Sequence, residues 1–231
     1  MKLLLFDIDG TLIRSDGAGR MALRAALEEM FGTAGPIDEY KMSGKTDARI
    51  VTDLLTAIGM SATDVNDKLP LVYDLMAEKA RQIYPERKVM ACPGVPELLQ
   101  RLGRRADVVL GLLTGNARQT APLKLIMGHL DPTQFPVGAY GSDHADRNHL
   151  PALAMQRAEQ LLARPFSGDN TVIVGDTPAD ILCARAGGAT AVAVASGWHA
   201  TTTLAQYHPD HLFENLSDTD MVVAALLEGN R

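Results

Sequence analysis

Apolar residues follow two periodicities along the chain, and the two alternate. Runs of strand length that are apolar, apart from a polar first residue in four of them, occupy residues 2–6, 107–113, 137–140, 171–175 and 190–194. Segments with apolar residues at helical spacing separate the later runs, at residues 96–102, 118–127, 151–163 and 178–186. Runs that are apolar at every position are typical of strands buried on both faces. Strands that alternate with helices predict a parallel sheet covered by helices on both sides.

A different pattern fills residues 15–88, where no convincing strand appears. Apolar residues at helical spacing predict helices over residues 20–31, 46–58 and 62–84. The last segment forms one or two helices, with a possible break near Pro70, because proline removes a helical hydrogen bond. Glycine and proline residues border this block on both sides, as is common at hinges and domain boundaries.

Two acids stand where the first apolar run ends. Asp7 closes the run, Asp9 follows two positions later, and Gly10 breaks the strand. Because side chains alternate along a strand, both carboxylates can project to the same side. Two such groups repel each other unless a cation such as Mg²⁺ lies between them. One could then act as a nucleophile and the other as an acid or base. A simple turn after a strand is the alternative.

Thr114 and Asp176 also stand directly beyond the ends of apolar runs. In open α/β sheets, ligands bind beyond the carboxyl ends of the strands. Each residue alone has a simpler explanation, since a Thr-Gly-Asn turn and a helix N-cap before Pro178 are both common. Their shared placement with Asp7 nevertheless predicts one site at one edge of the sheet.

Three stretches resemble the motifs of the haloacid-dehalogenase-like (HAD) hydrolases, whose commonest members are phosphatases. They are FDIDGTL at residues 6–12, LLTGN at 112–116 and VGDTPAD at 174–180. The resemblance covers the whole chain and is nearest to phosphoglycolate-phosphatase-like members. It implies an α/β, Rossmann-like parallel sheet core formed by residues 1–14 and 89–231. Residues 15–88 would be an all-helical cap domain inserted into that core.

The resemblance also implies roles for individual residues. Asp7 would be the nucleophile, Asp9 the general acid and base, and Thr114 a ligand of the phosphoryl oxygens. Mg²⁺ would be held by Asp7, Asp9 and Asp176, with Asp180 as a supporting carboxylate. The neighbouring residues expected to bind substrate are Gly10, Thr11, Gly115 and Asn116.

The third motif departs from the family pattern. Many relatives carry Lys-Pro-x-Pro there, whereas alignment on Pro151 gives Asn148-His149-Leu150-Pro151, without a lysine. Arg147 is the adjacent cation, and we expect it to substitute, because a guanidinium fork suits phosphate. The alternative is that Arg147 is a solvated loop residue.

Lys45 is a further candidate, in the segment Ser43-Gly44-Lys45-Thr46-Asp47 that precedes a predicted helix. A glycine-flanked lysine at a helix N-terminus can bind an anion. Cap loops select the substrate in similar proteins, so we expect Lys45 to contact the far end of the substrate. An ordinary helix capped by Thr46 beside a solvated lysine is the alternative.

Composition narrows the class of partner. The 22 basic and 28 acidic residues give a net charge of −6, without a dense basic block, which disfavours nucleic acid and anionic membrane. Cys92 and Cys183 show no metal-binding spacing and indicate buried thiols in a reducing compartment. No apolar stretch is long enough to span a bilayer. We therefore expect a cytoplasmic monomer or homodimer whose partner is a small-molecule phosphate ester.

The predicted activity is Mg²⁺-dependent hydrolysis of a phosphate monoester through an aspartyl-phosphate. Dehalogenases of this fold generally lack the second acid, so Asp9 counts against that chemistry. A phosphomutase of the same fold remains an alternative, although such relatives often carry an apolar residue at the position of Thr11. A catalytically silent binding protein is the other alternative, and the altered third motif is its only support.

Overall fold

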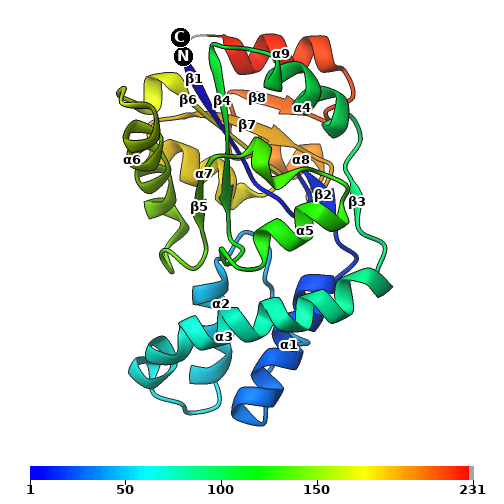
Figure 1. Cartoon of the computed structure of the whole chain (residues 1–231), viewed down its shortest axis with the longest axis vertical. Helices are drawn as coiled ribbons and strands as arrows, with labels where there is room; N and C mark the ends of the chain where they lie inside the picture. The colour runs from blue at the N-terminus through cyan, green and yellow to red at the C-terminus, as the bar shows by residue number, and fades with distance from the viewer. Residues whose placement is uncertain (229–231) are drawn as a thin grey trace.

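A six-stranded parallel sheet forms the centre of the protein in the computed structural model, which describes residues 1–228 (Figure 1). Its strand order is β5-β4-β1-β6-β7-β8. The strands are β1 (Lys2–Phe6), β4 (Val108–Thr114), β5 (Val137–Tyr140), β6 (Thr171–Gly175), β7 (Thr190–Val194) and β8 (His211–Phe213). Every pairing within this sheet is parallel, which confirms the predicted α/β fold class.

Helices cover both faces of the sheet. One face packs against α4 (Val95–Gly103), α5 (Ala121–Met127) and α9 (Thr219–Leu227). The other face packs against α6 (Leu150–Leu162), α7 (Pro178–Ala186) and α8 (Thr201–Ala205). Strand β1 contributes Leu4 and Phe6 to the first core and Leu3 and Leu5 to the second. Alternate side chains of β1 thus bury into opposite cores, which explains why residues 3–6 are all apolar.

The order in which the chain adds strands to the sheet reverses beside β1. The chain passes from β1 to β4 and β5 on one side, then returns to β6, which pairs with β1 on its other side. The register places Phe6 opposite both Leu112 and Val174. The loops that follow β1, β4 and β6 therefore leave the sheet at one place, the usual position of a ligand site in such folds.

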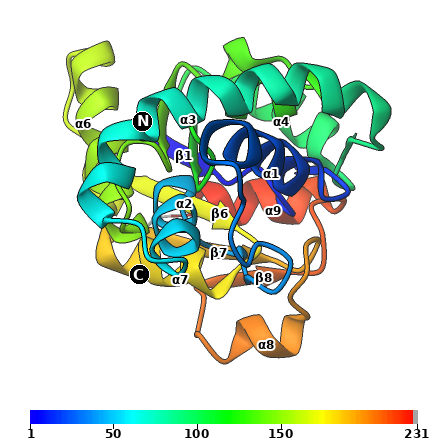
Figure 2. The same cartoon turned by 90° about the horizontal axis from the view of Figure 1, so that it is seen from below.

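A helical block lies beyond this edge of the sheet. It contains α1 (Ala18–Phe31), α2 (Asp47–Thr56) and α3 (Ala62–Ile83), which share an apolar core of their own. Figure 1 shows the block below the sheet, and Figure 2 shows its helices from that side. The chain enters and leaves it through β2 (Ile13–Arg14) and β3 (Met90–Ala91), which pair antiparallel.

Some details differ from the sequence prediction. Helix α3 continues through Pro70 instead of breaking there. Pro70 and Asn66 are exposed, so water can satisfy the Asn66 carbonyl that receives no bond from a proline nitrogen. The β2–β3 pair, β8, α8 and α9 were not predicted. Within residues 1–228, no helix has both the length and the apolar character needed to cross a membrane.

Truncation of the central strand tests this architecture. Leu5 is fully buried and its side chain packs directly against Gly111 of β4. We expect Leu5→Ala to lower the free energy of unfolding by about 2–5 kcal/mol, because it leaves a cavity in the core. Leu71 on α3 is 60% exposed, and Leu71→Ala should change it by less than about 0.5 kcal/mol. Urea unfolding measures both, and equal effects would contradict the assignment of β1 to the centre.

Candidate active site at the carboxyl edge of the sheet

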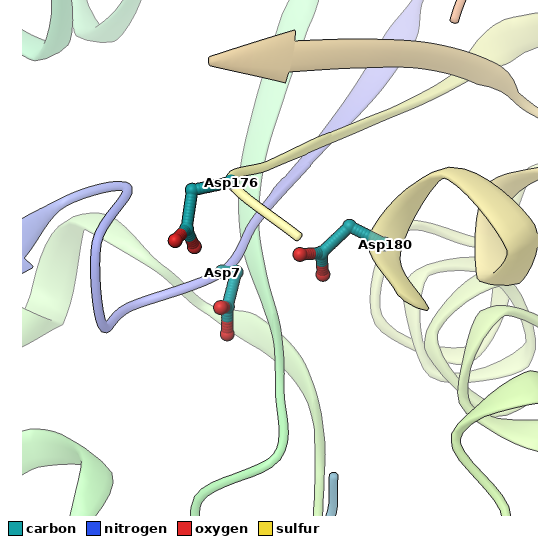
Figure 3. A group of neighbouring side chains, drawn as sticks. All are labelled: Asp7, Asp176 and Asp180. Carbon is teal, nitrogen blue, oxygen red and sulfur yellow. The ribbon is translucent and has the colours of Figure 1, made fainter. Parts of the chain in front are cut away.

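Three buried carboxylates converge where β1 and β6 end (Figure 3). Asp7 follows β1, Asp176 follows β6, and Asp180 lies in the first turn of α7. Oxygen atoms of all three lie within 4.8 Å of one another. The Asp7 amide donates to the Val174 carbonyl at 2.9 Å, so the β1–β6 pairing extends to the acid itself and fixes its backbone.

This cluster carries more negative charge than nearby cations neutralise. Burial raises the pKa of Asp7 to about 6, although the guanidinium of Arg147 opposes the shift. Burial, and then the charges of Asp180 and Asp7, raise the pKa of Asp176 well above its ordinary value. Hard oxygen donors crowded in this way favour a divalent cation such as Mg²⁺. The donor set therefore fits the predicted metal.

Arg147 is the cation within this cluster. It is buried at the start of a short 3₁₀ turn (Arg147–His149), so it is not a solvated loop residue. Its guanidinium hydrogen-bonds Asp180 and lies 3.3 Å from an Asp7 carboxylate oxygen. It also donates to the carbonyls of Leu113 and Gly44. Its Nε is buried without a hydrogen-bond partner among the described residues.

Asp180 has both carboxylate oxygens engaged. One accepts from Arg147, and the other accepts from the amide and hydroxyl of Thr177 at 3.0 and 2.7 Å. Thr177 is the N-cap of α7 and forms a capping box with Asp180, and Pro178 occupies the first turn. The N-cap is thus Thr177, which leaves Asp176 free of that role. Asp180 therefore holds Arg147 in place while one of its oxygens remains within 4.8 Å of oxygens of Asp7 and Asp176.

Asp9 lies in a separate group of polar contacts. Its carboxylate accepts from Lys124 at 2.5 Å, from the Asn116 amide at 2.8 Å and from the Ser15 hydroxyl at 2.8 Å. Burial alone would raise the pKa of Asp9, but the attraction and hydrogen bond of Lys124, with those of Asn116 and Ser15, hold it below its ordinary value. Asp9 is therefore favoured as a carboxylate.

Sequence reasoning missed Lys124. It lies on α5 and is only 5% exposed. The signal was a lysine one residue before Leu125 and three after Ala121, two buried apolar positions of that helix, which is an unusual place for a charge. Periodicity cannot show which distant acid such a lysine pairs with.

The other predicted residues lie around these two groups. Thr114 is fully buried and its hydroxyl accepts from the Asn116 amide at 2.7 Å, so Asn116 links Thr114 to Asp9. The Thr11 hydroxyl donates to Asp176 at 3.4 Å. Gly10 has φ +84° and lies against Asp176 so closely that any Cβ would collide with the carboxylate.

The loop after β7 also reaches the cluster. The Ser196 hydroxyl donates to the Gly10 carbonyl at 2.7 Å. A Cβ on Gly197 would lie 1.8 Å from an Asp176 oxygen, so the backbone here depends on the absence of a side chain. This loop therefore closes one side of the cluster.

Residues 43–47 of the helical block lie against the core beside this site. The Asp47 amide donates to the Gly115 carbonyl, and the Asp47 carboxylate accepts from the Ala117 amide, both at 2.7 Å. The Thr46 hydroxyl donates to the Ala145 carbonyl at 2.7 Å. A Cβ on Gly115 would lie 2.1 Å from the Lys45 carbonyl. The helical block thus contacts the loop after β4 through closely fitted backbone.

The Lys45 side chain points elsewhere. Within residues 1–228, its ammonium group donates to the Tyr40 hydroxyl at 2.7 Å and lies 3.9 Å from the centre of the Tyr40 ring. It is 3.8 Å from Asp53. All these partners belong to the helical block. The structure therefore brings the Lys45 backbone, and not its ammonium group, to the loop that carries Thr114 and Asn116.

Known proteins are similar to this chain in sequence and in fold. A family model described as HAD-hydrolase-like matches residues 150–219. A phosphoglycolate phosphatase from Synechococcus elongatus is 30% identical, covering 98% of this chain and 99% of that protein. The pyrophosphatase PpaX of Oceanobacillus iheyensis is 25% identical, over 96% of this chain and 97% of that protein.

Among solved structures, a hydrolase from Pseudomonas syringae superposes with a TM-score of 0.71 at 23% identity. The match covers 97% of this chain and 98% of that one. A putative β-phosphoglucomutase from Bacteroides vulgatus gives a TM-score of 0.69 at 17% identity, over 98% of this chain and 88% of that one. These two structures share the fold described above.

The charge imbalance of the carboxylate cluster predicts a metal-dependent stability. Without metal, Asp176→Asn should unfold at a higher temperature than the wild type, because it removes a buried charge beside Asp7 and Asp180. Saturating Mg²⁺ should stabilise the wild type by about 2–3 kcal/mol and the variant far less. Thermal unfolding in EDTA and in Mg²⁺ measures both effects. The exposed acid Asp169 provides the control Asp169→Asn, and an Mg²⁺ response that persists in Asp176→Asn would refute the cluster as the metal site.

Asp47 predicts a pH-dependent stability of the contact between helical block and core. Burial raises its pKa from 3.8 to about 6, against the opposing effects of Lys124 and the Ala117 amide. A raised pKa means that stability is lost as pH rises from about 4 through 6. Asp47→Asn, which can still accept from Ala117, should therefore gain about 1–3 kcal/mol over the wild type at pH 8 and almost nothing at pH 4. Urea unfolding at both pH values tests this, and a difference independent of pH would exclude it.

Proposed function

The chain belongs to the HAD-like hydrolases, and from this membership we propose that it is a Mg²⁺-dependent phosphatase of a small-molecule phosphate monoester. The observation that carries the proposal is the position of Asp7. Its carboxylate lies at the end of the central strand, within 4.8 Å of oxygens of two further acids and 3.3 Å from a buried guanidinium. An anionic nucleophile for phosphoryl transfer needs a cation beside it, because it approaches a phosphate that is itself an anion.

The proposed reaction has two steps. The first step starts from the substrate complex in which the Asp9 carboxyl group carries a proton. An Asp7 oxygen attacks phosphorus, the bond between phosphorus and the leaving oxygen breaks, and Asp9 gives its proton to that oxygen. This step forms an aspartyl-phosphate and releases the alcohol. In the second, water attacks the phosphorus of the aspartyl-phosphate while Asp9 takes up a proton from that water. The bond to Asp7 breaks, phosphate is released, and both acids return to their initial states.

Arg147 and Thr114 would hold the phosphoryl oxygens during both steps. The separation of 3.3 Å between the Arg147 guanidinium and the Asp7 carboxylate supports this role, because a phosphoryl group attacked by Asp7 would lie beside that cation. Arg147 stands beside Asp7, as expected of a cation that replaces the third-motif lysine. The backbone of Gly115 and the amide of Asn116 border the same space.

The ligands of Mg²⁺ would be the carboxylates of Asp7 and Asp176 and the backbone carbonyl of Asp9. Asp180 would support the site by holding Arg147 in place. A bound Mg²⁺ would offset the negative charge that the carboxylates and the phosphate bring together. The carboxylate-rich donor set and the raised pKa values of Asp7 and Asp176 support this assignment.

Residues 15–88 would act as the cap, with residues 1–14 and 89–231 as the core. The contacts of residues 43–47 with Gly115 and Ala117 support a closed arrangement that excludes water during the first step. Lys45 would contact the far end of the substrate once its side chain leaves Tyr40. A net charge of −6 favours a small phosphate ester over nucleic acid or membrane as the partner. We propose a cytoplasmic monomer or homodimer.

A phosphomutase is the second candidate, because the solved structures that share the fold include proteins described as putative β-phosphoglucomutases. A mutase would retain Asp7 and Asp9 but would pass the phosphoryl group to a second hydroxyl of the sugar. It would need a bisphosphate to load Asp7, and in that requirement it differs from a phosphatase.

A panel of phosphate monoesters, assayed with Mg²⁺ and with EDTA, tests the proposal. The wild type should hydrolyse at least one ester only with Mg²⁺, and Asp7→Asn should lower turnover by at least about 1,000-fold. Asparagine keeps the shape of the side chain, so circular dichroism should show an unchanged fold. Turnover that survives in Asp7→Asn would rule out the aspartyl-phosphate. A folded wild type that acts only on a sugar phosphate supplied with a bisphosphate would instead be a mutase.

A further inference from the structure

Lys124 is a buried cation to which the mechanism above gives no role. It is 5% exposed, and its ammonium group lies 2.5 Å from Asp9 and 2.6 Å from the Asn116 side-chain oxygen. Placing an ammonium group in a protein interior costs free energy unless it is closely paired. The carboxylate of Asp9 therefore supplies the negative charge that the buried Lys124 ammonium group needs.

The contacts of Asp9 hold its carboxylate in one orientation. Lys124 and Asn116 both donate to one oxygen, and Ser15 donates to the other. The Asp9 side chain is 37% exposed, so surrounding atoms alone do not immobilise it. Asn116 also donates to the Thr114 hydroxyl. The same amide therefore connects Asp9 with the residue expected to hold the phosphoryl group.

Arg147 and Lys124 are both buried, and they pair with different acids of the site. Arg147 pairs with Asp7 and Asp180, whereas Lys124 pairs with Asp9. The first pair lies at the nucleophile and the second at the acid that serves the leaving group. Each carboxylate with a proposed chemical role thus has a cation of its own.

We propose that Lys124 is a positioning residue that, together with Asn116, holds Asp9 where it can transfer a proton to the leaving-group oxygen. The inference rests on the proposed phosphatase activity. Proton transfer requires a heavy-atom separation of about 2.6–3.2 Å, and a displacement of about 1 Å can reduce a rate by about 100-fold. Lys124 would act through Asp9 and would not itself touch the substrate.

Gly19 supplies an independent way to move Lys124. It lies in the first turn of α1, and a Cβ there would be 2.9 Å from the Lys124 nitrogen and 3.3 Å from its Cε. The backbone of Gly19 is helical, so alanine itself fits the local conformation and favours the helix. Gly19→Ala should therefore displace the end of Lys124 while the helix remains folded.

The experiment compares leaving groups. Aryl esters such as p-nitrophenyl phosphate release a stable phenolate and need little protonation, whereas alkyl phosphates release a basic alkoxide and depend on Asp9. The quantity to compare is kcat/KM, because it reports the steps up to release of the leaving group and excludes the shared hydrolysis of the aspartyl-phosphate.

Lys124→Met should lower kcat/KM for alkyl phosphates by about 100-fold and for aryl phosphates by less than about 10-fold. Gly19→Ala should show the same asymmetry in a protein that circular dichroism shows to be folded. Lys124→Arg, which retains a charged donor, should recover part of the alkyl activity. The matched controls are Gly103→Ala, on α4 with open space around it, and Lys79→Met, which removes a lysine paired with Glu29 in the helical block. Neither control should change the ratio of the two activities.

Equal losses on the two classes of ester, or no loss on either, in Lys124→Met and Gly19→Ala would overturn the positioning role. If Lys124→Met does not fold, Gly19→Ala decides the question alone. A wild type without activity on any ester would instead overturn the phosphatase proposal on which the inference depends.

Discussion

The crowding of carboxylates at one edge of a parallel sheet is the constraint on which the rest of this structure depends. Asp7, Asp176 and Asp180 are buried within a few ångströms of one another. Such a group destabilises a folded chain unless cations are placed beside it with good geometry. Arg147, in a short turn before α6, is the cation beside this cluster, and Lys124, in the middle of α5, pairs with the neighbouring Asp9. These contacts hold the carboxylates of Asp9 and Asp180 in fixed positions.

The topology explains why the acids meet there. Strand β1 lies between β4 and β6, so the loops that follow the three strands emerge together. The backbone pairing continues from Phe6 into Asp7, and the glycines at positions 10 and 197 allow the chain to pass directly against Asp176. The three acids therefore stand directly beyond the most buried part of the sheet, which favours a fixed geometry for chemistry.

The same residues tie the core to the helical block. Arg147 donates to the carbonyl of Gly44, and Lys124 lies against Gly19 at the start of α1. Asp47, which belongs to the helical block, accepts a hydrogen bond from the Ala117 amide of the core. Any movement of the helical block therefore acts on groups that also hold Asp7 or Asp9. Under the proposed cap role of residues 15–88, closure over a substrate would act on the charges that are proposed to carry out the reaction.

The sequence by itself determined the parallel α/β core, the helical character of residues 15–88 and the position of the acids after the strands. These features follow from local signals, since periodicity and strand ends are read within a few residues. Arg147 was also predicted, because it stands beside a recognisable motif. Only the tertiary structure decided that Lys124 pairs with Asp9, 115 residues away, that Lys45 turns towards Tyr40, and that the loop after β7 closes on Asp176. The physical reason is that these contacts join segments distant in the chain. Their geometry depends on how the elements pack, and no local pattern records it.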